Sequence, residues 1–71
     1  MKKVKVRIKV LTEEGKYCLQ EIKGLKEGAV IEGRISDYND KAIEITWQGE
    51  DAVLWLGENC QIVIKRQFSQ Q

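Results

Sequence analysis

Apolar and polar residues alternate along much of the chain, which is the pattern of β-strands that have one buried and one exposed face. The alternation is most regular in residues 3–10, where aliphatic and basic side chains take turns. The aliphatic positions are Val4, Val6, Ile8 and Val10, and the basic positions are Lys3, Lys5, Arg7 and Lys9. This segment is therefore predicted to be a strand with an apolar inner face and a basic outer face.

Shorter alternating runs follow, separated by residues that are typical of turns. We predict further strands at residues 16–22, 31–35, 43–48, 52–56 and 60–64. The connecting turns contain glycine or the pair Asn-Asp and are predicted at residues 13–16, 24–28, 39–41, 49–51 and 57–59. Gly33 lies inside a predicted strand, which indicates a sharp bend or the close approach of another backbone.

These elements predict an all-β fold, a small and strongly bent antiparallel barrel of about five to six strands with no helix of consequence. Residues 1–66 are assigned to this single domain, and residues 67–71 to a polar C-terminal tail. We expect one common core. Its predicted members are Ile8, Ile35, Ile45, Trp47 and Ile62.

The composition is that of an ordinary globular domain, because 42% of the 71 residues are hydrophobic and 32% are charged. No apolar run approaches the roughly 20 residues that span a bilayer, and the basic start lacks the apolar segment of a signal peptide. We therefore expect a soluble, cytoplasmic protein with no membrane partner.

The sequence offers little for catalysis or metal binding. It contains no histidine, the commonest general base near neutral pH and the commonest metal ligand. Its two cysteines, Cys18 and Cys60, do not form a Cys-x-x-Cys pair. We expect both thiols to be reduced and buried, with a bridge between them as the alternative in an oxidising compartment. No catalytic residue, metal site or cofactor is predicted, and the protein is expected not to be an enzyme.

Positive charge is concentrated at the start of the chain. Five of the twelve Lys and Arg residues lie within residues 1–9, whereas residues 10–58 carry all eleven acidic residues. If the first and last strands are neighbours, Lys65 and Arg66 join the basic face of residues 3–9. Such a face would bind the phosphate backbone of a nucleic acid. The alternative is an edge strand whose lysines prevent aggregation.

The aromatic residues have different predicted roles. Trp47 continues the apolar face of its strand and is expected in the core. Because residues 53–56 are apolar on both faces, Val53 and Trp55 are predicted to lie in an interface between copies of the chain. Tyr38 lies beside a predicted turn, where it either stacks on a ligand or closes the rim of the core.

The spacing of glycine and aliphatic residues between 28 and 64 resembles the two-part signature of the Sm and Sm-like family, including its bacterial host-factor branch. The first part comprises Gly28, Gly33-x-Ile35, Tyr38-Asn39 and Ile43-x-Ile45. The second part is Val53-Leu54-Trp55-Leu56-Gly57-Glu58-Asn59-Cys60-x-Ile62.

The resemblance implies a bent five-stranded barrel that assembles into rings through its edge strands and binds single-stranded, often uridine-rich, RNA. The family's structural positions are matched by Gly33, Ile35, Ile45, Gly57 and Asn59. Its binding positions are not matched. Lys41 stands where a base-stacking side chain is usual, Ile43 where an asparagine reads the base, and Leu56 where an arginine precedes the glycine. Because the stacking side chain and both polar readers are absent, the family's usual base pocket is not expected. The family's N-terminal helix is also replaced by the strand at residues 3–10.

Two functions are compatible with these patterns. The first is a non-enzymatic, ring-forming barrel that binds RNA or another single-stranded nucleic acid. Its predicted binding residues are Lys3, Lys5, Arg7, Lys9, Tyr38, Lys41, Lys65 and Arg66. The second is a small protein-interaction or regulatory module with an SH3-like barrel, such as an inhibitor encoded by a mobile element, which binds a protein partner through the segment around Trp55.

Overall fold

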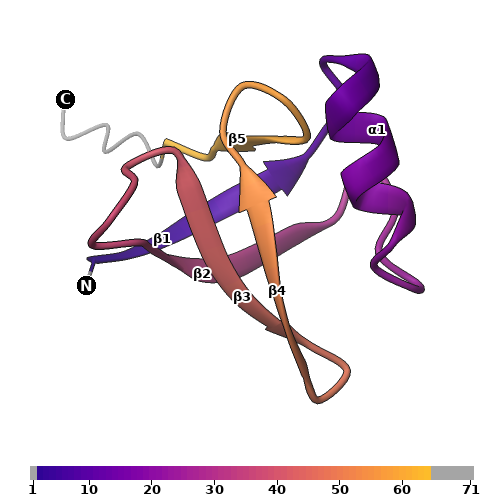
Figure 1. The fold of residues 1–71 in the computed structure, drawn as a ribbon. Helices are drawn as coiled ribbons and strands as arrows, with labels where there is room; N and C mark the ends of the chain where they lie inside the picture. Colours follow the sequence, from indigo (N-terminus) through magenta and orange to yellow (C-terminus); the bar gives the residue numbers. More distant parts are fainter. Residues whose placement is uncertain (1, 65–71) are drawn as a thin grey trace, which may run out of the picture.

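A computed structural model describes residues 2–64, in which five strands form one curled antiparallel sheet (Figure 1). The elements in chain order are β1 (Lys2–Ile8), α1 (Glu13–Gln20), β2 (Val30–Ile35), β3 (Ala42–Trp47), β4 (Glu50–Trp55) and β5 (Cys60–Ile62). The strand order across the sheet is β4-β3-β2-β1-β5. The predicted all-β, strongly bent antiparallel fold is confirmed. The predicted tail at 67–71 lies outside the described residues.

The sheet curls most closely around Gly33 in β2. A β-carbon at this position would lie 2.7 Å from Cγ2 of Ile43 and 2.8 Å from Cγ2 of Ile45. Only glycine lets β2 and β3 approach this closely, which confirms the close contact predicted for Gly33.

The first strand lies inside the sheet, contrary to the edge position considered from the sequence. β1 pairs with β2 from Lys2 to Arg7 and with β5 from Val6 to Ile8. Two further hydrogen bonds extend the second pairing, from Lys9 N to Asn59 O (3.1 Å) and from Val63 N to Lys5 O (2.8 Å). The neighbouring first and last strands are therefore confirmed, and β1 is not an edge strand from Lys5 onward.

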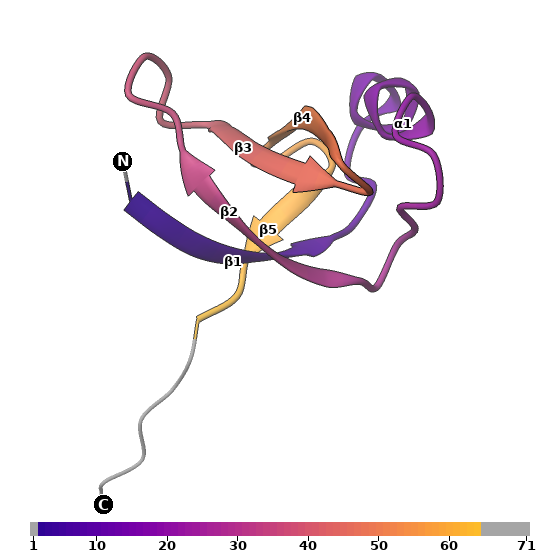
Figure 2. The same ribbon diagram turned by 90° about the horizontal axis from the view of Figure 1, so that it is seen from below.

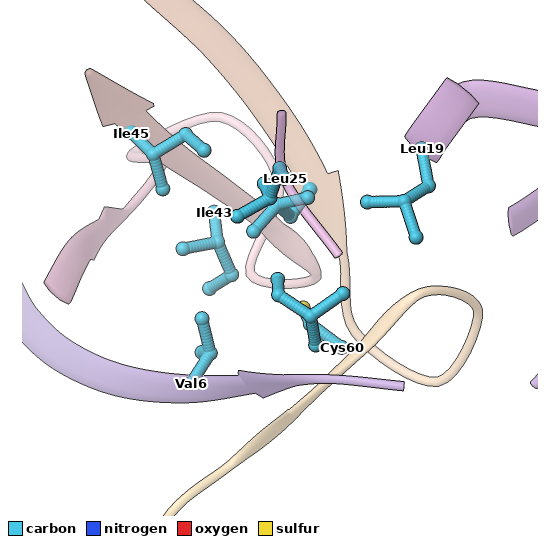
Figure 3. Packing of buried hydrophobic residues seen from close by; sticks show 8 residues of the cluster. Val6, Leu19, Leu25, Ile43, Ile45 and Cys60 are labelled. Carbon is cyan, nitrogen blue, oxygen red and sulfur yellow. The ribbon is translucent and has the colours of Figure 1, made fainter. Parts of the chain in front are cut away.

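The core lies on the concave face of the sheet, where buried aliphatic side chains from different strands converge (Figure 3). The buried apolar residues are Val6, Ile8, Leu19, Leu25, Ala42, Ile43, Ile45, Leu54 and Cys60. Of the predicted core, Ile8 and Ile45 are buried, and Ile35 and Trp47 are partly buried against this cluster. The indole Nε1 of Trp47 donates a hydrogen bond to Lys23 O (2.9 Å).

The burial predicted for the last strand is wrong beyond Cys60. Ile62 is 42% exposed and Ile64 is 80% exposed. Ile62 lies opposite Val6 and therefore on the core face. Because β5 ends the sheet, no further strand covers this side of Ile62. The alternation therefore predicts correctly that Ile62 faces the core. It contains no information on whether the strand lies at the edge of the sheet.

The predicted hairpin at 13–16 and the strand at 16–22 are wrong, because this segment forms helix α1. Thr12 is the N-cap, and its side-chain oxygen accepts a hydrogen bond from Gly15 N (2.9 Å). Glu13 and Glu14 place negative charge in the first turn, where the helix dipole favours it. The acceptor and these charges stabilise a helix start, and Leu19 then enters the core.

The predicted turns at 39–41 and 57–59 are confirmed. Lys41 N donates to the side chain of Asn39 (2.9 Å), and Gly57 has a positive φ of 84°. The β3–β4 hairpin turns one residue earlier than predicted, at Gln48 and Gly49, which both have positive φ. This conformation at two successive residues is typical of the tight turns that match the twist of a hairpin.

Helix α1 packs on the turn between β4 and β5 through Gly15. A β-carbon at position 15 would overlap the carbonyl oxygen of Glu58. The same oxygen accepts hydrogen bonds from Leu11 N (2.8 Å) and Thr12 N (3.3 Å). The helix start is thus held against this turn by backbone contacts that leave no space for a larger residue.

Substitution Ile45→Ala should destabilise the fold strongly, because Ile45 is 4% exposed and packs in the core. We expect a loss of about 2–5 kcal/mol in the free energy of unfolding, measured by urea denaturation. The matched change Val53→Ala at a 40% exposed position should cost much less. A loss for Ile45→Ala no larger than that of Val53→Ala would contradict the packing described here.

Substitution Gly15→Ala should also destabilise the protein, although alanine is a better helix former than glycine. The added methyl group must displace α1 from the carbonyl of Glu58, and overpacking of this kind costs about 1–3 kcal/mol. Lys16→Ala, at the exposed next position, is the control. An increase in thermal stability for Gly15→Ala would show that the helix does not dock as described.

Candidate nucleic-acid interface

Three basic residues of β1 form a row on the outer face of the sheet. Lys3, Lys5 and Arg7 are exposed, whereas Val6 and Ile8 between and beside them are buried on the opposite face. Alternate residues of a strand are about 7 Å apart, so the row presents evenly spaced cations along one line. We call Lys3, Lys5 and Arg7 the basic row.

The neighbouring strand β2 carries both a basic and an acidic residue on this face. Arg34 lies directly opposite Lys3, and Glu32 lies directly opposite Lys5. On both sides Arg7 has uncharged neighbours, Val30 in β2 and Gln61 in β5. In the part of the chain that the structure describes, no side chain of the basic row forms an ion pair or a hydrogen bond. The cations are thus available to an external anion.

The loop between β2 and β3 lies at the Lys3 end of the basic row. Lys2 pairs with Ile35, the last residue of β2, so the loop that follows begins beside the start of β1. Figure 2 shows the start of β1 and this loop at the same end of the sheet. Tyr38 in this loop is 97% exposed. It does not close the rim of the core, so its ring is free to stack on a ligand.

Lys41 belongs to the same loop and is also exposed. Its backbone is fixed on both sides, because Lys41 N donates to Asn39 Oδ1 (2.9 Å) and Lys41 O accepts from Leu56 N (2.8 Å). The loop therefore presents one aromatic and one cationic side chain from an anchored backbone.

The remaining predicted binding residues are not part of this group. Lys9 lies at the other end of β1, where it bonds to Asn59 through the backbone. Lys65 and Arg66 lie outside the described residues. The structure thus places Lys3, Lys5 and Arg7 along the outer face of β1, and Tyr38 and Lys41 in the loop at the Lys3 end of that strand.

Arg34 is a basic residue of this face that the sequence analysis did not identify. Its exposed position in β2 follows from alternation, but its place opposite Lys3 depends on the pairing register between β1 and β2. Register joins segments that are distant in sequence, so the alternation of a single strand contains no signal for it.

The predicted interface residues Val53 and Trp55 have different surroundings. Val53 is 40% exposed on β4, which is an edge strand. Trp55 is partly buried and lines a hollow of about 380 Å3 together with Tyr17 and Cys18 of α1. Helix α1 therefore covers part of the surface of Trp55, and the place of Trp55 in an interface between copies of the chain stays a prediction.

The two cysteines are free thiols, so the structure contains no bridge between them. Cys60 is buried, as predicted, whereas Cys18 is only partly buried. Burial raises the pKa of the Cys60 thiol to about 11, which keeps it protonated and unreactive near neutral pH. Among residues 2–64 no group of three or more Cys, Asp or Glu side chains is arranged to hold a metal ion.

No helix among the described residues is long and apolar enough to cross a membrane. No protein-family model matches this chain, and no curated protein or solved structure matches it either.

Proposed function

We propose that this protein is a non-enzymatic module that binds RNA or another single-stranded nucleic acid on the outer face of β1. The observation that carries the proposal is the basic row, whose side chains have no ion pair within the described chain. Phosphate groups are the anions that such a regular series of cations suits, and their neutralisation releases counterions.

The position of β1 supports a binding role over a protective role. Lysines on an edge strand prevent pairing with other chains, but β5 already covers β1 from Lys5 to Ile8. Lys5 and Arg7 therefore do not protect an open edge. Their alignment on an interior strand needs another explanation, and an anionic polymer that follows the strand supplies one.

The exposed ring of Tyr38 favours a single-stranded ligand. Base stacking on an aromatic side chain requires an unpaired base, and it contributes about 1–3 kcal/mol per base. Tyr38 lies at the Lys3 end of the basic row, so a strand whose phosphates contact the row reaches Tyr38 with its next bases.

Assembly into a ring remains part of the proposal. The sheet ends in two edge strands, β4 and β5, and head-to-tail pairing of β4 in one copy with β5 in the next would cover both. The exposed side chain of Ile62 on β5 would then be covered by the neighbouring copy.

A protein-interaction module is the second candidate function. The hollow between α1 and β4 favours it, because Tyr17 and Trp55 present aromatic surface there and Tyr17 is 63% exposed. Aromatic residues in a surface hollow are typical of interfaces with proteins. Binding of oligonucleotides by the purified protein distinguishes the first function from this one.

The double substitution Lys5→Glu and Arg7→Glu should weaken oligonucleotide binding to a similar extent for every sequence, since phosphate contacts carry no base information. Fluorescence anisotropy at about 50 mM and about 200 mM salt measures this, and the wild-type affinity should fall steeply with salt. Lys16→Glu with Lys23→Glu, on exposed positions outside β1, is the matched control. Absence of wild-type binding at the lower salt concentration would refute the nucleic-acid function.

Substitution Val53→Glu should yield smaller, folded particles in light scattering, because it places a charge on the edge strand proposed to pair with another copy. Glu50→Gln, on the opposite face of β4, serves as the control and should leave the particle size unchanged. A wild-type protein that stays monomeric at high concentration would rule out ring assembly.

A further inference from the structure

A hollow lies on the outer face of the sheet, where β2 and β3 diverge. These strands pair only at Arg34 with Glu44 and at Ile35 with Ile43. Next to the pair Arg34 and Glu44 this hollow opens to a volume of about 530 Å3, and Gly33 contributes to its lining. This volume lies within the range of about 300–1,000 Å3 that is typical of small-ligand sites.

At one end of this outer hollow lie two cations, Lys3 and Arg34, beside the acidic Glu32. Lys3 and Arg34 lie directly opposite each other on β1 and β2, and both line the hollow. Like charges in directly opposite positions destabilise a sheet. Neither side chain forms an ion pair with any residue between 2 and 64. A bound anion between the two cations would remove their repulsion.

The β3 and β4 side of the hollow offers hydrogen-bond acceptors and an apolar surface, and its Glu44 lies directly opposite Arg34. Glu44 of β3 is only partly exposed, and no hydrogen bond to its carboxylate is present within the described chain. Thr46 Oγ1 lies 3.4 Å from Asp51 Oδ1 farther along the wall. Val53 is the register partner of Glu44 and exposes its aliphatic side chain beside it.

We propose that the outer hollow is a nucleotide subsite that selects bases with an exocyclic amino group. The phosphate lies between Lys3 and Arg34, the base lies against Val53, and the amino group donates a hydrogen bond to the carboxylate of Glu44. Neighbouring strands are about 5 Å apart, so the cationic end and Glu44 lie within the length of one nucleotide. This inference rests on the proposed nucleic-acid function and specifies its ligand.

Cytosine and uracil differ in the group that would face the carboxylate of Glu44. Cytosine presents an amino donor where uracil presents a carbonyl acceptor, and Glu and Asp carboxylates accept from the cytosine amino group. A carbonyl oxygen facing the carboxylate of Glu44 would be repelled. The outer hollow therefore favours cytosine over uracil, and its preference is independent of the phosphate contacts.

The test compares labelled oligocytidylate and oligouridylate of equal length with the full-length protein at low salt. Wild-type protein should bind the cytidine oligomer about tenfold more tightly. Glu44→Gln should remove this preference, because the amide can also donate to the uracil carbonyl. Glu50→Gln, which makes the same charge change on the opposite face of β4, should keep it. The double change Lys3→Gln and Arg34→Gln should weaken binding of both oligomers.

The outcomes separate this inference from the function on which it rests. Equal binding of the two oligomers by the wild type, or a preference that persists in Glu44→Gln, overturns the nucleotide subsite and leaves the nucleic-acid function standing. Failure of both oligomers to bind overturns both. Circular dichroism of each variant shows that the fold is retained.

Discussion

The buried side chain of Asn59 joins three parts of the molecule, and the placement of the proposed binding face depends on it. The amide is fully buried. Its Oδ1 accepts from Trp55 N (2.8 Å), and its Nδ2 donates to Gly15 O (3.3 Å). The backbone oxygen of Asn59 accepts from Lys9 N (3.1 Å). One residue thereby fixes the end of β4, the start of α1 and the end of β1. Because an unpaired buried amide would cost about 1–3 kcal/mol, the two side-chain hydrogen bonds of Asn59 are needed for the fold.

The contacts of Asn59 determine where β5 lies, and thereby whether β1 is paired on both sides. Asn59 immediately precedes β5, and its bond to Lys9 aligns Cys60 with Ile8. β1 is then held between β2 and β5, and its outer side chains are presented by a strand that is paired on both sides from Lys5 onward. A row of cations on such a strand keeps its spacing without a ligand, which lowers the entropy lost on binding.

The sequence predicts the strands well where alternation is regular. β1, β2 and β3 appear at the predicted positions because each has one aliphatic face, and Gly33 was recognised as a site of close approach. The helix was missed because Gly15 is a typical turn residue. The local cap by Thr12 and the acidic first turn were signals for it, but the need for glycine at position 15 comes from Glu58. That contact joins residues far apart in the sequence.

The candidate site could likewise be predicted only where it depends on alternation within one strand. The basic row follows from the alternation of one strand, so it could be identified without a structure. The pairing of Lys3 with Arg34 and of Arg34 with Glu44 depends on the register between strands. The exposure of Ile62 depends on the place of β5 at the edge of the sheet. Neither feature can be derived from the periodicity of a single segment.

Lys3 connects the two components of the proposed site. It is the first member of the basic row along β1, and it also lines the outer hollow that crosses the sheet toward β4. A nucleic-acid strand that follows the row therefore passes the mouth of the hollow. Contacts along the row are electrostatic and independent of base identity, whereas contacts with Glu44 depend on the base. Salt should weaken the first kind of contact far more than the second, so base preference should persist where overall affinity falls.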